Sequence, residues 1–133
     1  MAFVHGKGTS ITVDSVDLTD FTNNVAKKRS ADSHDITTFG ATGHTYQGGL
    51  TDGTYTLTGT YDGGATSTPR DTLEGALGTV VTFIYQQETA SGKPKSTGSA
   101  LITAYEETAP VADMITWSAT LQISGAETEG TQT

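Results

Sequence analysis

The sequence contains no cysteine, which excludes disulfide bonds and thiolate metal sites. It also lacks any apolar run near the roughly 20 residues that a membrane-spanning helix needs. Its first ten residues, MAFVHGKGTS, lack the charged start and long apolar middle of a secretory signal peptide. We therefore expect a protein that is made in a reducing cytoplasm and does not enter a membrane.

Basic residues are scarce. The chain has 7 Lys and Arg against 15 Asp and Glu, which gives a formal net charge of -8. Proteins that wrap nucleic acid need a basic surface, so this balance argues against that class. Three basic residues stand together at Lys27, Lys28 and Arg29. We interpret them either as a solvated strand face or as an interface stripe that pairs with acidic residues of a neighbouring copy.

Signatures of catalysis are lacking as well. There is no G-x-S-x-G motif, no cysteine nucleophile, and there are only three histidines. The adjacent Glu106 and Glu107 would face opposite sides of a strand, so they do not form the carboxylate pair that glycosidases use. Since a catalytic function must be argued from a site, we expect a protein that is not an enzyme and uses no cofactor.

One cluster could be a metal site. The stretch ADSHDITTFGATGHTYQGG places Asp32, His34, Asp35 and His44 close together in the sequence. Zinc held by histidine and carboxylate needs three or four groups that converge at about 2 Å. On a strand, His34 and Asp35 would point to opposite faces, and His44 follows several glycines. The pattern therefore favours polar surface residues over a metal site.

What the sequence does have is the alternation of half-buried strands. Thr54–Tyr61 and Asp113–Ser124 alternate apolar and hydroxyl side chains, and Thr79–Gln86 has the same period. The predicted core residues on these strands are Tyr55, Leu57, Tyr61, Phe83, Ile115, Trp117 and Leu121. The opposite face, which we name the hydroxyl face, consists of Thr54, Thr56, Thr58, Thr60, Thr116, Ser118 and Thr120.

Other segments complete the predicted fold. Further strands are expected at Thr9–Leu18 with a turn near Asp14, Asn23–Ser30, His34–Thr38 and Ser99–Glu107. One helix is expected from Thr68, a capping residue followed by proline, to the stop at Gly78. Phe39–Gly53, which is rich in glycine, is predicted to be a long irregular loop.

The predicted fold class is mainly β: an antiparallel β-sandwich or small barrel with one flanking α-helix. We expect a single domain over residues 1–125, followed by a flexible acidic C-terminal tail over residues 126–133, because the tail has nothing to bury.

Much of the chain, from about Gly6 to Gly125, resembles a known family. The phrases that carry the resemblance are NNVAKKRSADSHDITTFGATGHTYQGGLTDGTYTLTGTYDGG, TLEGALGTVVTFIY and SGKPKSTGSALITAYEETAPVADMITWSATLQISG. They resemble the major tail tube proteins of long, non-contractile-tailed phages of the siphophage type, particularly phages of actinobacteria.

The resemblance implies a structural virion protein of the phage tail, assembled in the bacterial host cytoplasm. Six copies would form a ring whose strands join in an inner β-barrel. The rings would stack around a tape-measure protein and meet tail-tip and terminator proteins. Viral DNA would pass through the lumen during ejection without sequence-specific binding. Such an assembly would remove open sheet edges and close with rotational symmetry.

The resemblance also assigns roles to residues. Phe39–Gly53 matches a loop that reaches neighbouring subunits or the next ring, so Phe39, His44 and Tyr46 become candidate contact residues. The hydroxyl face becomes a candidate for the lumen or solvent, and the acidic net charge would repel DNA phosphates. Two alternatives stay open: a tail terminator or injection-system tube relative of the same fold, and a monomeric carbohydrate-binding or adhesin-like β-sandwich.

Overall fold

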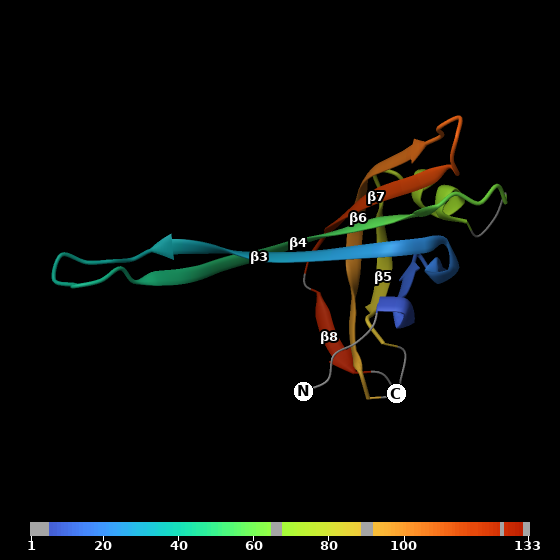
Figure 1. The fold of residues 1–133 in the computed structure, drawn as a ribbon. Helices are drawn as coiled ribbons and strands as arrows, with labels where there is room; N and C mark the ends of the chain where they lie inside the picture. Colours follow the sequence, from blue (N-terminus) through green and yellow to red (C-terminus); the bar gives the residue numbers. More distant parts are fainter. Residues whose placement is uncertain (1–5, 65–67, 89–91, 126, 132–133) are drawn as a thin grey trace.

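A computed structural model describes residues 6–64, 68–88, 92–125 and 127–131 (Figure 1). Eight strands form one antiparallel sheet in the order β2-β1-β5-β6-β7-β4-β3, and β8 pairs with β6. The strands are β1 (Ser10–Val13), β2 (Val16–Asp17), β3 (Thr22–Asp35), β4 (Tyr46–Thr60), β5 (Val80–Gln86), β6 (Pro94–Thr108), β7 (Thr116–Ile123) and β8 (Thr128–Thr131). The three short helices are η1 (Gly6–Gly8), η2 (Thr19–Phe21) and η3 (Arg70–Glu74). The mainly β, antiparallel prediction is confirmed.

The sheet bends around its core. The Tyr55 ring of β4 lies 4.8 Å from the Phe83 ring and 5.4 Å from the Tyr85 ring, both on β5. In the sheet, however, β6 and β7 lie between β4 and β5. Strands that are not neighbours therefore face one another across the same apolar interior, and the sheet covers it from more than one side.

The predicted core is largely confirmed. Tyr55, Leu57, Phe83, Trp117 and Leu121 are all buried. Two predicted members are not: Tyr61 is half-buried and Ile115 is 37 % exposed. Both lie just past a strand end, because β4 stops at Thr60 and β7 starts at Thr116. The alternation of buried and exposed side chains therefore holds inside the strands and fails just beyond their ends.

The predicted irregular loop over Phe39–Gly53 is wrong, because β4 already begins at Tyr46. It pairs with β3 in a long hairpin whose register runs from Thr22↔Gly59 to Asp35↔Tyr46, with two irregularities. Of the strand predicted at His34–Thr38, only the first two residues belong to β3. The glycines serve close packing here: a Cβ on Gly53 would meet Arg29 Cδ at 2.6 Å. Glycine lets the long side chain of the paired strand lie across β4.

The predicted α-helix is also corrected. Within Thr68–Gly78 the structure has only η3, a five-residue segment of π type, followed by turns. The expected cap is present, since the Asp71 amide donates to Thr68 Oγ1 at 3.4 Å. Gly75 directly follows η3, and glycine disfavours continuation of the helix there. Gly78 takes a φ of 82°, which ends the turns that follow. Leu73 is buried and anchors η3 on the sheet.

The predicted turn between the first two strands is confirmed. Asp14 and Ser15 take φ values of 51° and 65°, so β1 and β2 form a two-residue hairpin. None of the helices in the described ranges is long and apolar enough to cross a membrane.

The C-terminal segment differs from the predicted flexible tail. Thr128–Thr131 form β8, which pairs with Pro94–Thr97 at the start of β6. The reason is electrostatic, because Glu127 and Glu129 meet basic side chains of β3. Residues 126, 132 and 133 of the predicted tail lie outside the described residues, and the domain boundary at 125 stays a prediction.

Candidate assembly interface

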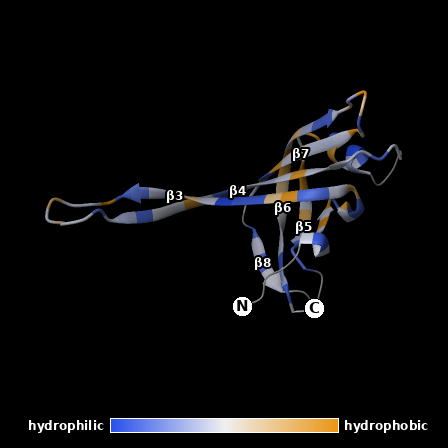
Figure 2. Cartoon of the chain, in the orientation of Figure 1, coloured by the Kyte–Doolittle hydropathy of each residue, from blue (hydrophilic) through white to orange (hydrophobic). Residues whose placement is uncertain are grey.

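The β3–β4 hairpin extends away from the core as a two-stranded ribbon (Figure 1). Four of its large apolar side chains are exposed: Ile36, Phe39, Tyr46 and Leu50. Phe39 is 112 % exposed and Leu50 is 82 % exposed. Figure 2 shows apolar residues at the outer end of this hairpin, far from the core. Two strands alone are marginal in water, and clustered exposed apolar side chains mark an interaction surface.

The hairpin tip, residues 36–45, is ordered by its own hydrogen bonds. The Thr37 hydroxyl and amide donate to Asp35 Oδ1 at 2.5 and 2.9 Å, and both lower the pKa of Asp35. His44 Nδ1 lies 3.4 Å from Asp35 Oδ2, and the His44 ring lies 6.1 Å from the Tyr46 ring. Of the candidate contact residues, His44 and Tyr46 therefore lie beside each other, and Phe39 lies exposed in the turn between β3 and β4.

The cluster of Asp32, His34, Asp35 and His44 is spread over the outer part of the hairpin. Asp35 pairs with Thr37 and His44, while His34 packs beside Gly49 on the paired strand. Among the residues that the structure describes, no group of three or more His, Asp or Glu side chains is placed to hold a metal ion. The cluster orders the hairpin.

Two of the three basic stripe residues pair within the chain. Lys27 Nζ lies 2.9 Å from Glu127 Oε1 and 2.8 Å from Glu129 Oε1, and Arg29 Nη1 lies 3.1 Å from Glu127 Oε2. Lys27 also donates to Ser96 Oγ at 3.0 Å. We call these five residues the Lys27 network. It joins β3, β6 and the C-terminal segment, and the Glu127 side chain is 0 % exposed.

The third stripe residue, Lys28, is exposed and alternates with its neighbours to the other side of β3. Sequence reasoning missed Glu127 and Glu129. The only signal was an acidic segment far along the chain from a basic one, and such a signal does not identify which groups meet.

The network shifts the pKa values of Lys27, Glu129 and the neighbouring Tyr55. Partial burial alone lowers the pKa of Lys27, but hydrogen bonds to Glu129 and Glu127 outweigh it and raise this pKa above its ordinary value. The hydrogen bond from Lys27 is the largest cause that lowers the pKa of Glu129 to about 2. Burial, followed by the Glu127 carboxylate, raises the pKa of Tyr55 to about 12. At neutral pH both partners of the Lys27–Glu129 pair are therefore charged.

Acid is expected to weaken the attachment of β8. Because the pKa of Glu129 is about 2 in the folded chain and 4.5 ordinarily, its stabilisation is present above pH 4.5 and is lost as the pH falls through 2. Amide NMR shifts of Thr128–Thr131 should change over this window. Glu129→Gln, which cannot ionise, should remove the change; an identical pH response in the variant would contradict this role of Glu129.

The hydroxyl face lies where the alternation placed it. Across β4 and β7, Thr56 pairs with Thr120, Thr58 with Ser118, and Thr60 with Thr116, on the side opposite the buried residues. Next along the strands Thr54 pairs with Gln122, and the Gln122 side-chain amide donates to Asp52 Oδ1, so a carboxylate borders the hydroxyl face at this end. Nothing here assigns this face to a lumen, so that role stays a proposal.

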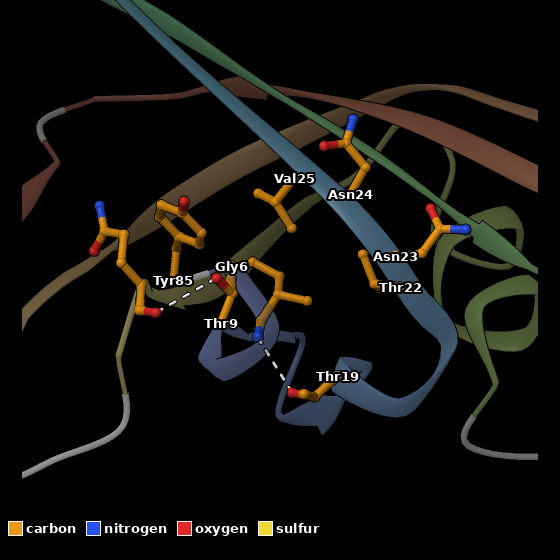
Figure 3. Close-up of a pocket in the computed structure, with 10 residues that line it drawn as sticks. Gly6, Thr9, Thr19, Thr22, Asn23, Asn24, Val25 and Tyr85 are labelled. Atoms are coloured by element: carbon orange, nitrogen blue, oxygen red, sulfur yellow. Dashed lines mark hydrogen bonds between the residues drawn. The ribbon is translucent and has the colours of Figure 1, made fainter. Parts of the chain in front are cut away.

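A pocket of about 330 Å³ lies where β1, β5 and the start of β3 meet the short helices (Figure 3). We call it the N-terminal pocket. Val25 of β3 and Tyr85 of β5 point into it from different strands. Thr9 Oγ1 donates to the Gln87 carbonyl at 3.4 Å, and the Ile11 amide donates to Thr19 Oγ1 at 3.3 Å. The lining residues are Gly6, Thr9, Ile11, Thr19, Thr22, Asn23, Asn24, Val25, Tyr85 and Gln87.

Comparisons with known proteins place this fold. No protein-family model matches the sequence, and no curated protein matches it. Solved structures do match. A chain of the tail of an empty gene transfer agent particle, refined with C6 symmetry, is 16% identical with a TM-score of 0.73; the match covers 95% of this chain and 98% of that one.

Two other solved chains match over nearly the whole length. The SPP1 tail tube chain is 16% identical with a TM-score of 0.79, and the match covers 98% of this chain and 80% of that one. A chain of the sheath–tube complex of an extracellular contractile injection system is 12% identical with a TM-score of 0.74, covering 97% and 92%. At these identities the likeness shows the fold: this chain has the fold that occurs in these tail, tail tube and sheath–tube assemblies.

Proposed function

We propose that this protein is a phage tail tube subunit that polymerises as stacked rings. The observation that carries the proposal is the full-length fold likeness to chains from a tail with C6 symmetry, a tail tube and a sheath–tube complex. The exposed apolar hairpin supports it, because an isolated chain gains nothing from presenting Phe39 and Leu50 to water.

The sheet edges support a ring. β3 has β4 on one side and, within the described ranges, no strand on the other. An open edge of this length would template pairing with another chain, and a closed ring of copies satisfies it in every subunit. Six copies per ring follows the C6 symmetry of the gene transfer agent tail. The assembly would be a virion tail of the siphophage, actinobacteriophage-like type, assembled in the host cytoplasm without a membrane.

The lumen follows from the same arrangement. The hydroxyl face offers neutral side chains, and the chain carries a formal net charge of -8. An acidic, hydroxyl-lined channel would let DNA pass without holding its phosphates. The further partners would be a tape-measure protein inside the tube and tail-tip and terminator proteins at its ends. The sheath–tube likeness supports a second candidate, an injection-system tube.

Replacing residues 39–46 by a Gly-Ser linker of equal length tests the role of the hairpin. These residues are exposed, so the variant is expected to stay folded but to form no tubes. Electron microscopy and sedimentation of the variant beside the unaltered chain measure this. Tubes of normal length from the variant would refute the hairpin's role. A chain that stays monomeric and binds a glycan would favour the carbohydrate-binding alternative.

A further inference from the structure

We propose that Phe39 at the hairpin tip of one copy inserts into the N-terminal pocket of a neighbouring copy. The inference rests on the proposed function, in which the hairpin is an assembly element, and it identifies the surface that receives the hairpin. It joins two features of this chain: Phe39, an apolar tip residue fully exposed to water, and a pocket with a mixed lining of apolar and polar residues.

The tip presents one large apolar side chain next to small residues. Phe39 is a single large apolar side chain, and the next residues are Gly40, Ala41, Thr42 and Gly43. A Cβ at Gly40 or Gly43 would meet nothing within 4 Å, so the surface beside the phenyl ring is narrow and open. A narrow tip can enter a recess that a broader loop would not reach.

The pocket has the matching chemistry. Ile11, Val25 and Tyr85 supply the apolar part of its lining, and the other lining residues are a glycine and residues with hydroxyl or amide groups, such as Thr9 and Gln87. Its volume of about 330 Å³ lies at the lower end of the range for ligand pockets, roughly 300–1,000 Å³, which suits one aromatic ring and its flanking backbone.

Charge favours the same pairing. Copies with a formal net charge of -8 repel one another, so a contact between them is best made by uncharged elements. Residues 36–43 of the tip carry no charge, and within the described ranges neither do the residues that line the pocket. Tip and pocket can therefore join without burying an unpaired charge.

Position makes the contact intermolecular. The pocket includes Thr22–Val25 at the start of β3, whereas Phe39 follows the end of that strand. A strand of this length spans ~45 Å, so a chain cannot fill its own pocket. Each copy offers one tip and one pocket at opposite ends of β3. Such a head-to-tail contact closes into a ring or extends into a filament.

Photo-crosslinking tests the pairing. Phe39 is replaced by p-benzoylphenylalanine, which keeps an aromatic ring, and the assembled protein is irradiated and digested for mass spectrometry. Cross-links are expected between copies, at pocket residues such as Ile11, Val25 and Tyr85. The matched control carries the probe at Val111, which is 107 % exposed in the turn between β6 and β7. That probe should not label the pocket.

A second variant tests the pocket from its own side. Gly6 lines the pocket and a Cβ on it would meet nothing within 4 Å, so Gly6→Trp adds a bulky side chain beside the pocket without a clash at its first atom. The concentration needed for assembly is expected to rise at least tenfold. Normal assembly of Gly6→Trp, or tubes whose Phe39 cross-links lie outside the pocket, would overturn this inference alone. A chain that never assembles would overturn both it and the proposed function.

Discussion

Gly59→Ala is expected to lower the free energy of unfolding by about 3 kcal/mol or more. A Cβ at this position would lie 1.8 Å from the carbonyl oxygen of Phe21 and 2.9 Å from Trp117 Nε1. The obstacle is backbone, which cannot rotate away as a side chain does. The same carbonyl accepts the Trp117 indole hydrogen bond at 3.2 Å. The added methyl group would therefore separate η2 from β4 and leave a buried indole N–H without its acceptor.

Urea unfolding, followed by the fluorescence of the single tryptophan, measures this loss. The matched control is Gly48→Ala in the same strand, where a Cβ would meet nothing within 4 Å. The control is expected to change stability by no more than ~0.5 kcal/mol, as surface substitutions usually do. Equal midpoints for the two variants would show that β4 shifts freely past η2, against the packing described.

Lys27→Met is expected to lower the free energy of unfolding by about 3 kcal/mol, because it removes one of the two cations that pair with the buried Glu127 carboxylate. The Glu127 side chain is 0 % exposed, and among the described residues its remaining cationic partner would be Arg29, at 3.1 Å. Ser96 belongs to this network and the Tyr55 hydroxyl donates to Glu127, so the loss of Lys27 would loosen the contact between β3 and β6. Methionine keeps the length and apolar character of the lysine stem, so the variant tests the loss of the charge alone.

Lys28→Met is the matched control, because it removes the same charge one residue away on an exposed face. Thermal unfolding of both variants at low and high salt compares the two sites. The Lys27 variant should lose far more stability, and salt should change the difference little because the pair is partly buried. If both variants unfold at the same temperature, the Lys27 network does not hold the C-terminal segment.

The sequence predicts best what depends on neighbouring residues. Alternation along β4 and β7 placed Tyr55 and Trp117 in the core and their threonine neighbours on the other face, because strand periodicity is local. The hairpin was missed for the opposite reason. Its glycines resemble loop punctuation, and only the register with β3 shows that Gly53 makes room for Arg29.

In the candidate site, too, residues close in sequence were predicted and distant partners were not. Phe39, His44 and Tyr46 were expected to act together, and the hairpin brings them to its outer end. Lys27 and Arg29 were expected on an open stripe, yet they pair with Glu127, about a hundred residues away in the sequence. Such a pairing depends on where β8 lies in the fold, and neither composition nor spacing contains that information.

Electron microscopy of the purified, unaltered protein over a range of concentrations tests the central claim most directly. We expect rings and hollow tubes, with sixfold symmetry about the tube axis and the β3–β4 hairpin bridging neighbouring copies. Particles the size of one chain at every concentration would contradict it, as would filaments without a central channel.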